Sequence, residues 1–483
     1  MTTQEQVIAD IAREVVARLR AQMQQQPTTS PAANSLPSPA LRDGVFATVD
    51  EAANAADAAA KKVGEMGLED RGRMIAIVRR ICIDRADELG KMELEESKVG
   101  RLDHKIQKLK NMQYVVGIEG MSSAARTDKS GLCLIERAPW GAIGMVLPVT
   151  HSVPTMAANA INILAAGNTA LFAPHPSAKR VAQYALQLFN REIEREVGVA
   201  NSLTTILEPS IEAADQIFQH PRIALLCVTG GPVVVKAAGK YGKRVIAAGP
   251  GNPPVVVDET ADLAAAARDI ILGGAFDNNL LCIGEKEVFV VASVFREFMR
   301  AMQSAGGFEL DKAAIERLTN AAFTFDGDGK GCVRAHVRKE LVGKDVRVLA
   351  AAAGVSVPDS AQILYGETDE DHAFVVEEQM MPFIPIVRVK DVDAGIAAAV
   401  KAEHGYRHTA IMHSKNMDNV TRMAKAMNTT IFVNNASSLA SLGFGGPGYL
   451  SHSIATPTGE GITTPMTFTR ERQITIGNAL RII

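Results

Sequence analysis

Long apolar runs, a surplus of basic residues and paired cysteines are all missing from this sequence of 483 residues. No apolar run approaches the roughly 18 residues of a membrane span, and the N-terminus lacks the apolar core of a signal peptide. The 51 Lys and Arg residues are balanced by 54 Asp and Glu residues, which leaves a net charge of -3 and no basic footprint for a phosphate backbone. We therefore expect a soluble intracellular protein that binds neither membranes nor nucleic acid.

Cysteine is also scarce, and its spacing excludes two common uses. The five cysteines are widely separated and odd in number, which argues against a disulfide framework and for a reducing compartment. They are Cys82, Cys133, Cys227, Cys282 and Cys332. The sequence holds no CxxC pair and no HExxH motif, and its ten histidines are scattered. We therefore expect no metal site.

The N-terminal segment is predicted to stand apart from the rest of the chain. Apolar residues at helical spacing predict a short amphipathic helix within residues 1–21. The apolar positions are Val7, Ile8, Ile11, Val15 and Leu19. Residues 22–43 are rich in Gln, Pro, Ser, Thr and Ala, a composition that buries too little apolar surface to order itself. This stretch predicts a flexible linker.

From residue 44 onward the pattern predicts an α/β protein. Its length and its hydrophobic content of 47% indicate about two or three domains. Long helices are expected before residue 120, one of them over 71–89 with Cys82 on its core-facing stripe. Strands are expected at 131–137, 140–147, 169–172, 223–228, 244–247 and 254–257, and helices at 155–165, 177–194 and 232–240. This alternation predicts a parallel sheet with helices on both faces.

A second α/β region is expected after Asp258. Helices are predicted at 261–273 and 294–304, and strands at 287–291, 383–389 and 429–433. Residues 473–476 predict a further strand that pairs outside both cores, a common arrangement where subunits join.

Two glycine-rich segments are candidates for binding a phosphate. Gly443, Gly445 and Gly448 satisfy the GxGxxG pattern, but a proline interrupts it and no strand directly precedes it, so it predicts a loop. The Thr-Gly-Gly turn at 229–231 lies between a buried strand and a helix, whose N-terminal amides can face an anion. It is the better candidate, although any strand-to-helix turn favours glycine.

Cys282 is the strongest candidate for a nucleophile. It follows a polar segment between a helix and a strand, where a side chain can face a cleft. Cys227 lies in an apolar strand and Cys133 in a predicted hairpin, so core packing explains both. Cys332 is the rival, since a Cys near a residue such as His336 can form a nucleophile and base pair, but its Gly-rich and Asp-rich setting predicts an exposed loop. Spacing alone leaves the choice open.

Several strings in a fixed order carry a more specific signal. They are Ala-Ala-Gly-Asn at 165–168, Ala-Pro-His-Pro-Ser-Ala-Lys at 173–179, Val-Thr-Gly-Gly at 228–231, Ala-Ala-Gly-Pro-Gly-Asn-Pro at 247–253, Cys-Ile-Gly-Glu-Lys at 282–286 and Glu-Glu-Gln-Met-Met-Pro at 377–382. From about residue 44 to the C-terminus, the chain resembles the aldehyde dehydrogenase superfamily. Within it, the chain is similar to the CoA-acylating propionaldehyde and acetaldehyde dehydrogenases of bacterial microcompartments, which also carry such an N-terminal helix and linker.

The resemblance implies roles for matching positions. Cys282 falls on the nucleophile that forms a thioester. Other positions fall near NAD: Thr229, Gly230 and Gly231 near its pyrophosphate, Glu378 near the nicotinamide ribose, and Pro174 and His175 beside the adenosine ribose. Ala173 stands where relatives usually carry a lysine that touches this ribose.

Two departures from the family pattern bear on the chemistry. Hydrolytic members carry a glutamate that activates water, and Ala248 stands in its place, so a thioester on Cys282 should survive until the thiol of coenzyme A attacks it. His151 stands where relatives have an asparagine that helps to bind the oxyanion. A neutral imidazole can donate the same hydrogen bond, a cationic one would lower the thiolate pKa, and a packed histidine on a turn is the third reading.

The implied fold is α/β and aldehyde dehydrogenase-like. It comprises a Rossmann-type NAD-binding domain (44–120 and 138–257), an α/β catalytic domain (258–446) and a small oligomerisation sheet (121–137 and 462–483). The implied reaction converts a short-chain aldehyde, with propionaldehyde first, NAD and coenzyme A into acyl-CoA and NADH. A hydrolytic aldehyde dehydrogenase and an acyl-phosphate reductase are the enzymatic alternatives, and an idle shell scaffold is the third.

The resemblance also implies partners and a location. Residues 1–21 are expected to dock onto microcompartment shell or core proteins, in the bacterial cytoplasm. A homodimer or homotetramer is expected. The aldehyde chain length and the choice between NAD and NADP stay open.

Overall fold

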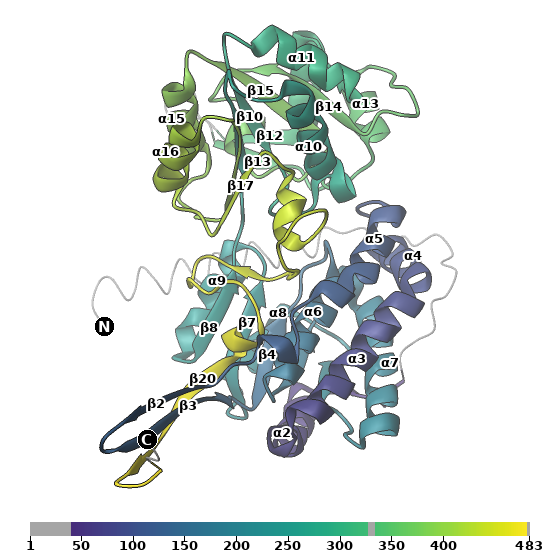
Figure 1. Cartoon of the computed structure of the whole chain (residues 1–483). Helices are drawn as coiled ribbons and strands as arrows, with labels where there is room; N and C mark the ends of the chain where they lie inside the picture. Colours follow the sequence, from purple (N-terminus) through teal and green to yellow (C-terminus); the bar gives the residue numbers. More distant parts are fainter. Residues whose placement is uncertain (1–39, 327–333, 481–483) are drawn as a thin grey trace, which may run out of the picture. The chain divides into compact units, whose positions relative to one another are not determined.

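The computed structural model describes residues 40–326 and 334–480 (Figure 1). The predicted helix of residues 1–21 lies outside the described residues, as do nearly all of the predicted linker at 22–43 and the rival nucleophile Cys332. The described chain builds two large parallel sheets with helices on their faces, and three small antiparallel sheets. The predicted α/β class is therefore confirmed.

The first large sheet has six parallel strands in the order β1-β6-β5-β4-β7-β8. They are β1 (Val45–Phe46), β4 (Ala142–Val146), β5 (Thr169–Ala173), β6 (Leu203–Ile206), β7 (Ile223–Thr229) and β8 (Arg244–Ala248). β5 and β6 are buried along their whole length because helices cover both faces, and this is why the inner strands read as continuous apolar runs. We call this sheet and its helices the first lobe.

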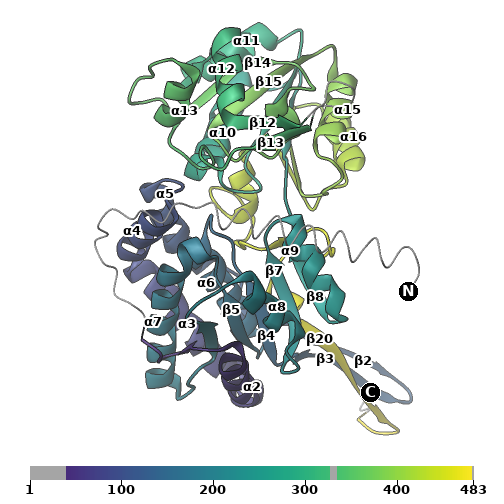
Figure 2. The ribbon, with the colours of Figure 1, turned by 180° about the vertical axis from the view of Figure 1, so that it is seen from behind.

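The helices of the first lobe form two layers. They are α2 (Val49–Glu65), α3 (Leu68–Asp84), α4 (Ala86–Ser97), α5 (Leu102–Lys110), α6 (Ser152–Ala165), α7 (Lys179–Val197), α8 (Ile211–Gln219) and α9 (Pro232–Ala238), with short 3-10 turns at Asn111–Tyr114, Ile118–Gly120, Pro176–Ala178 and Gly239–Tyr241. Side chains of α2, α8 and α9 share one buried cluster with the sheet (Figure 2). α6 and α7 pack against the strands as well, and α3 packs on both of these helices.

Local sequence explains where α2 begins. Thr48 and Glu51 form a reciprocal capping box, with Glu51 N donating to Thr48 Oγ1 at 3.2 Å and Thr48 N donating to Glu51 Oε2 at 3.1 Å. Asp50 and Glu51 in the first turn and Lys62 in the last turn also oppose the helix dipole. The buried face of this helix is built largely of alanine, which lets it lie close to the sheet.

The helix predicted over 71–89 is wrong in one respect, because the chain breaks at Arg85. Its φ of -109° and ψ of 18° leave helical geometry between α3 and α4. The Arg85 guanidinium donates to the Tyr184 hydroxyl at 3.0 Å and to Glu88. Both helices keep apolar residues in phase across the break, so periodicity alone did not reveal it.

The second large sheet has seven parallel strands in the order β11-β14-β15-β10-β9-β16-β17. They are β9 (Pro254–Val257), β10 (Glu287–Val291), β11 (Gly307–Glu309), β14 (Ile363–Thr368), β15 (Phe383–Val389), β16 (Thr409–His413) and β17 (Ile431–Asn434). β9 pairs with β10 and β16, so the segment 254–257, assigned by sequence to the first domain, belongs to this sheet. The apolar run of β9 has no feature that tells one parallel sheet from another.

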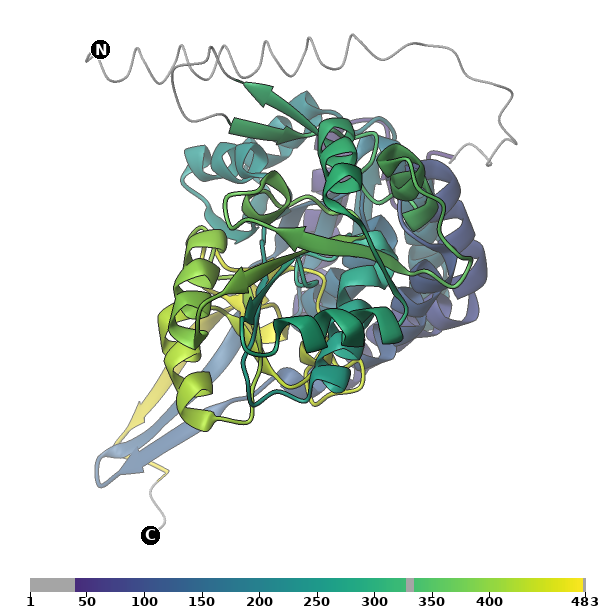
Figure 3. The same cartoon turned by 90° about the horizontal axis from the view of Figure 1, so that it is seen from above.

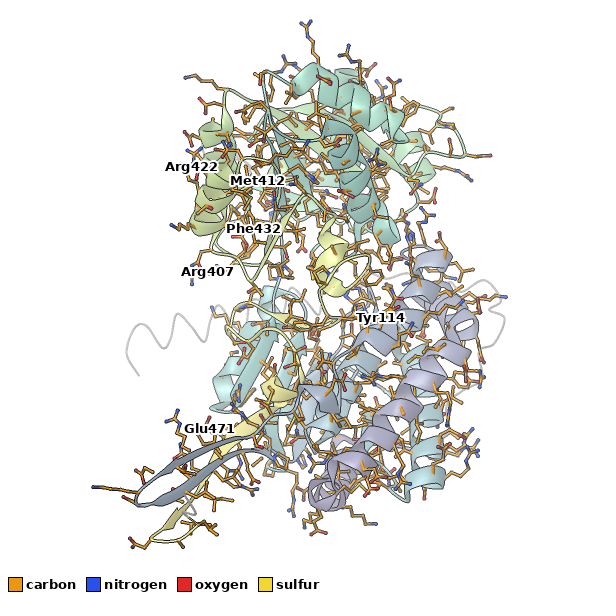
Figure 4. All side chains as sticks on the ribbon, in the orientation of Figure 1. Tyr114, Arg407, Met412, Arg422, Phe432 and Glu471 are labelled. Atoms are coloured by element: carbon orange, nitrogen blue, oxygen red, sulfur yellow. The ribbon has the colours of Figure 1, made fainter. Side chains whose placement is uncertain are left out.

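Helices flank this second lobe too. They are α10 (Leu263–Ala275), α11 (Phe295–Ser304), α12 (Lys312–Ala322), α13 (Val346–Ala353), α14 (Ala373–Val376), α15 (Val392–Ala402) and α16 (Met417–Met427), with 3-10 turns at Phe276–Asn279 and Ser438–Leu442. α15 and α16 lie side by side and share a buried cluster with β9, β10, β15 and β16 (Figure 3). The cluster includes Met412 of β16, and Phe432 of the neighbouring β17 packs against it (Figure 4). A hairpin of β12 (Phe323–Asp326) and β13 (Arg334–Val337) completes this lobe.

The C-terminal segment returns to the first lobe. β20 (Thr469–Gly477) pairs antiparallel with β3 (Gly131–Pro139), which pairs with β2 (Ala124–Asp128). Glu471, labelled in Figure 4, faces Arg137 across this sheet at 3.7 Å. A short pair, β18 (Ile454–Ala455) and β19 (Gly461–Ile462), and a 3-10 turn at Pro465–Phe468 precede β20. The predicted tail strand at 473–476 is thus part of a longer strand.

Buried amides fix this returning segment. Asn159 Nδ2 donates to Ser453 Oγ at 2.8 Å, and Asn168 Nδ2 donates to Phe468 O at 2.9 Å. Both asparagines are fully buried. Because an unpaired buried amide costs about 1–3 kcal/mol, the segment 451–468 is part of the first lobe and not an appendage.

Candidate active site

Strand ends gather the candidate residues on two sheet edges. Parallel strands share a carboxyl edge, and in the first lobe His151, Pro174 and Thr229 follow or end the strands β4, β5 and β7. In the second lobe the candidates precede strands instead: Cys282 precedes β10 and Glu378 precedes β15. Since β10 and β15 are neighbours, these two residues lie on the same amino edge of the second sheet.

A left-handed turn presents Cys282. Asp277, Asn278 and Asn279 have φ values of 51°, 57° and 64°, so three consecutive residues other than glycine adopt the left-handed conformation. Asp and Asn tolerate this region best, yet each such residue costs roughly 1 kcal/mol. The segment therefore needs partners that hold it in place.

An ion pair holds the start of this turn. Lys108 Nζ of α5 lies 2.5 Å from Asp277 Oδ2, and both side chains are fully buried. Arg101 N donates to Asp277 Oδ1 at 2.8 Å. Burial alone would raise the pKa of Asp277, but the ammonium groups of Lys108 and Lys105 and the hydrogen bonds hold it below its ordinary value. The carboxylate is therefore ionised and anchors the turn to the first lobe.

Amide side chains hold the rest of the turn. Asn278 Nδ2 donates to Gly343 O at 3.0 Å, and Asn279 Nδ2 donates to Gly274 O at 2.8 Å and to Glu285 O at 2.9 Å. These bonds tie the turn to the end of α10 and to the segment that enters β10. The polar segment before Cys282, which sequence singled out only as a loop, is thus a rigid support.

Cys282 is half-buried at the end of this support. The pKa of its thiol is raised to about 12, mainly by burial and also by the charge of Glu378, whereas Lys286 and the backbone amides of Cys282 and Ile283 oppose the rise. Burial also raises the pKa of Cys82 and Cys227, which pack in the first lobe as the sequence predicted. Of these three thiols, Cys282 is the one with a lysine among the groups that lower its pKa.

Glu378 joins this neighbourhood. It is half-buried and accepts a hydrogen bond from Gly251 N at 3.3 Å. Burial raises the pKa of this carboxyl, and the Lys286 ammonium opposes the shift. Because Glu378 in turn acts on the Cys282 thiol, the structure brings together two residues that sequence placed in one site.

His408 is a site residue that sequence analysis missed. It precedes β16, and a Cβ on Gly251 would lie 2.6 Å from Cys282 O and 2.8 Å from His408 Cγ, so both residues border the same glycine. Its Nδ1 lies 2.9 Å from Thr409 Oγ1, and its buried Nε2 has no partner among the described residues. Burial and the Lys286 charge lower its pKa to about 4, so the imidazole is neutral. Only the fold reveals its proximity to Cys282.

His151 stands outside this group. It is the N-cap residue of α6, it is buried, and its ring lies 5.4 Å from the ring of His452. Burial and the nearby Lys108 lower its pKa well below the ordinary value, which favours a neutral imidazole over the cationic one that would activate the thiol. Among the described residues, its ring contacts and hydrogen bonds do not include Cys282.

The turn at 229–231 leaves room for a ligand. Gly231 has a φ of -64°, which any residue adopts, and a Cβ there would meet no atom of the described residues within 4 Å. A Cβ on Gly230 would meet only Val234, at 3.8 Å. Neither packing nor backbone conformation requires these glycines, so the missing side chains leave open space beside the turn. Pro232, which begins α9, has no N–H, and Gly230 N donates to Ala248 O at 3.3 Å. The Thr229 hydroxyl bonds the Ser453 hydroxyl at 2.9 Å.

Pro174 and His175 follow β5 on the same edge. Pro174 is buried and His175 is exposed, with Nδ1 accepting a hydrogen bond from Ser177 N at 3.1 Å. Although His175 is exposed as a whole residue, neighbouring atoms partly desolvate its ring, and this desolvation and the charge of Lys339 lower its pKa. Lys339 therefore places a positive charge near His175, two residues after Ala173, which stands where relatives carry a lysine.

Ala248 ends β8, beside Thr229 in the neighbouring strand. Its buried methyl group cannot accept a proton.

The glycine pattern at 443–448 forms a loop, as predicted, in which a Cβ on Gly448 would lie 1.9 Å from Ser441 O. These glycines permit close packing of the loop on itself.

The described part of the chain has neither a metal-binding cluster nor a membrane-spanning helix. In residues 40–326 and 334–480, no group of three or more His, Cys, Asp or Glu residues is placed to hold a metal ion. The same ranges contain no helix that combines the length and apolar character needed to cross a bilayer.

Comparison with known proteins adds independent findings. A model of the aldehyde dehydrogenase family matches residues 19–306. The chain is 44% identical over 446 residues to the acetaldehyde dehydrogenase (acetylating) EutE of Salmonella typhimurium, which covers 91% of this chain and 94% of that protein.

Two solved structures of propionaldehyde dehydrogenases resemble this chain over most of its length. A propionaldehyde dehydrogenase from the fucose utilisation microcompartment of Clostridium phytofermentans matches with a TM-score of 0.87 and 40% identity, over 91% of this chain and 100% of that one. The propionaldehyde dehydrogenase of Rhodopseudomonas palustris, with bound CoA and an acylated cysteine, matches with a TM-score of 0.87 and 39% identity, over 91% and 100%.

Proposed function

The chain belongs to the aldehyde dehydrogenase family, and we propose that it is a CoA-acylating member that converts a short-chain aldehyde, NAD and coenzyme A into acyl-CoA and NADH. Propionaldehyde is the proposed first substrate. The observation that carries the proposal is the combination of Cys282 on a rigid turn with Ala248 at the position of the hydrolytic base.

Cys282 is proposed as the nucleophile. Its thiolate adds to the carbonyl carbon, the C=O electrons move to oxygen, and a tetrahedral oxyanion forms. When bound, NAD supplies the oxidised nicotinamide that accepts the hydride, which leaves a thioester on Cys282. The thiol of coenzyme A then attacks the thioester carbon, loses its proton to solvent and expels the Cys282 thiolate.

The residues around the turn at 229–231 are proposed to hold NAD. Thr229, Gly230 and Gly231 are assigned to the pyrophosphate, supported by the open space at both glycines. Pro174 and His175 are assigned to the adenosine ribose, on the same sheet edge. Glu378 is assigned to the nicotinamide ribose, and its electrostatic proximity to Cys282 supports this assignment.

His151 is proposed to donate a hydrogen bond to the oxyanion, as the asparagine of relatives does. Its neutral state supports this reading, since a neutral imidazole carries one N–H group, and its Nδ1 has no partner among the described residues. Coenzyme A is the proposed acceptor because Ala248 supplies no base for water.

Product analysis tests the proposal. With propionaldehyde, NAD and coenzyme A, the protein should form NADH and acyl-CoA at equal rates. Without coenzyme A, NADH should appear in a burst of about one equivalent per active site, followed by slow turnover. Sustained fast formation of free acid would indicate the hydrolytic alternative. Dependence of NADH formation on inorganic phosphate would indicate an acyl-phosphate reductase, and a complete absence of NADH would indicate a scaffold.

Substitution of the nucleophile gives a second test. Cys282→Ala should abolish NADH formation while NAD binding and the unfolding midpoint stay near those of the wild type, because only the nucleophile is removed. Cys332→Ala is the matched control and should retain most activity. The reverse pattern would move the active site to Cys332.

Domain roles and location are part of the same proposal. We assign NAD binding to 44–120 and 138–253, catalysis to 254–446 and subunit contacts, in a homodimer or homotetramer, to 121–137 and 462–483. Residues 1–21 are proposed to dock on microcompartment shell or core proteins in the bacterial cytoplasm. Deletion of residues 1–21 should leave the kinetics of the purified enzyme unchanged and release it from shells. Loss of activity on deletion would assign the segment to the enzyme's own structure.

A further inference from the structure

Three consecutive charged residues follow the nucleophile into the core. Glu285, Lys286 and Glu287 have no exposed surface. Burial of a charge is costly unless the group is paired or loses its charge, so each of the three needs an explanation. Burial raises the pKa of Glu287 well above its ordinary value, which favours the neutral form of this carboxyl. Glu285 accepts hydrogen bonds from Ser438 N and Ser438 Oγ, both at 2.8 Å.

Lys286 is bound by the turn that presents Cys282. Its Nζ donates to Asn279 O at 2.7 Å and to Leu281 O at 3.3 Å, and it also contacts Asn279 Oδ1. These three oxygens match the three N–H groups of an ammonium. None of them belongs to a carboxylate, so the positive charge stays uncompensated by a direct ion pair.

The position of these acceptors couples Lys286 to the turn. Asn279 is the last of the three left-handed residues, and Leu281 directly precedes Cys282. A single ammonium therefore joins the start of β10 to the backbone on the N-terminal side of the nucleophile. No other described side chain bonds both of these carbonyl groups.

The charge of Lys286 also acts on the sulfur. It lowers the pKa of the Cys282 thiol and so opposes the effect of burial, which raises it to about 12. Burial lowers the pKa of Lys286 itself to about 8, so the ammonium predominates at neutral pH. The charged or titratable groups that face it are Glu378, Cys282, Glu287, Glu285 and His408.

We propose that Lys286 is a positioning residue, whose ammonium fixes the turn around Cys282 and stabilises the thiolate of that residue by its charge. The inference rests on the proposed function only in treating Cys282 as the nucleophile.

Alkylation of Cys282 by iodoacetamide, followed by peptide mass spectrometry from pH 6 to 10, tests this in the full chain. Because a pKa of about 12 lies above this range, the pH midpoint is defined here as the pH at which the alkylation rate reaches a fixed value. The rate measures the thiolate fraction without requiring turnover, so it is independent of whether the aldehyde reaction is assigned correctly. Lys286→Met removes the charge and keeps the length of the side chain. It should raise the pH midpoint of alkylation and lower the rate at pH 7.5 about tenfold, since one pKa unit is a tenfold change in thiolate.

Lys105→Met is the matched control. Lys105 is equally buried, but it bonds Thr150 O at 3.2 Å and pairs with Glu93 at 3.5 Å. It bonds no atom of the turn and acts on it only through its charge on Asp277. This variant should lose stability while the pH midpoint of Cys282 alkylation stays at the wild-type value. Lys286→Arg keeps the charge and should return the midpoint toward that of the wild type.

The outcomes separate charge from structure. A folded Lys286→Met protein with the wild-type midpoint overturns the proposal, as does an equal shift in Lys105→Met. If Lys286→Met does not fold, Lys286→Gln, which is neutral and still able to donate to a carbonyl, carries the same comparison. The proposed function is tested separately, by an aldehyde assay that compares Cys282→Ala with the wild type.

Discussion

The ion pair between Lys108 and Asp277 should control both the stability of the protein and the reactivity of Cys282. The perturbation is Asp277→Asn, because asparagine also tolerates the φ of 51° found at this position. The variant keeps an oxygen that can accept from Arg101 N, so the turn loses one charge and little else. What remains is a fully buried Lys108 ammonium, 2.5 Å from a neutral amide.

The expected loss of stability follows from this geometry. Removing one partner of a buried ion pair leaves an uncompensated charge and costs about 3–5 kcal/mol. The double variant Asp277→Asn with Lys108→Met buries no charge and should recover most of that loss. An exposed ion pair contributes about 1 kcal/mol or less. The free energy of coupling between positions 108 and 277 is therefore expected to be several times larger than that.

The assay combines urea unfolding with kinetics. Asp103→Asn is the matched control, because Asp103 pairs with Arg101 at 2.7 Å and its side chain is 59% exposed. That variant should change the unfolding midpoint very little. In Asp277→Asn, kcat/KM should fall about 10-fold to 100-fold, because Cys282 is displaced when its support relaxes.

Two results would refute this reasoning. If Asp277→Asn unfolds at the same urea concentration as Asp103→Asn, the buried pair contributes no more than an exposed one. If it is destabilised but alkylates and turns over like the wild type, the ion pair stabilises the fold without positioning the nucleophile.

Three further predictions follow from the site. His151→Asn should keep most of kcat if the position donates to the oxyanion, whereas His151→Ala should lose about 2–4 kcal/mol of transition-state stabilisation; equal rates close to the wild type would make His151 structural. Gly231→Ala should change stability by about 1 kcal/mol or less, because its Cβ meets open space, but should raise the KM for NAD; an unchanged KM would remove the cofactor from this turn. Burial raises the pKa of Glu285 from its ordinary 4.5 to about 7, so its protonated form stabilises the fold below pH 4.5 and this stability is lost as the pH rises through 7. Between pH 4.5 and 7.5 this effect should lower the free energy of unfolding of the wild type, measured in urea titrations, by about 3 kcal/mol. Glu285→Gln should remove most of this pH dependence, and an unchanged dependence would contradict the raised pKa of Glu285.

Sequence reasoning succeeded where the pattern was local. The alternation of apolar strands with amphipathic helices predicted the parallel sheets, and β9, β10 and β15 have the bounds expected of them. It failed where geometry depends on a distant partner. At the break, Arg85 bonds Tyr184, which lies in another helix, and helical periodicity does not encode such a contact.

The candidate site divides in the same way. The polar segment before Cys282 made it a candidate, but spacing alone left the choice of nucleophile open, and the family motifs were needed to favour Cys282 and to single out Glu378. Lys286 closes the Cys-Ile-Gly-Glu-Lys string, but the resemblance attached no role to it, and His408 is one of ten scattered histidines. Their proximity to Cys282 arises because neighbouring strands β10, β9 and β16 begin at one edge of the sheet.

The order in which the chain is synthesised gives the returning C-terminal segment a further meaning. When residue 450 leaves the ribosome, every strand of both large sheets has been made, yet the amides of Asn159 and Asn168 still await Ser453 and Phe468. β3 likewise has one unpaired edge until β20, nine residues long, arrives. The first lobe can therefore close only after residue 468 and strand β20 have been made. Until then, a nascent chain displays a strand edge of the kind that recruits chaperones or pairs wrongly with another chain.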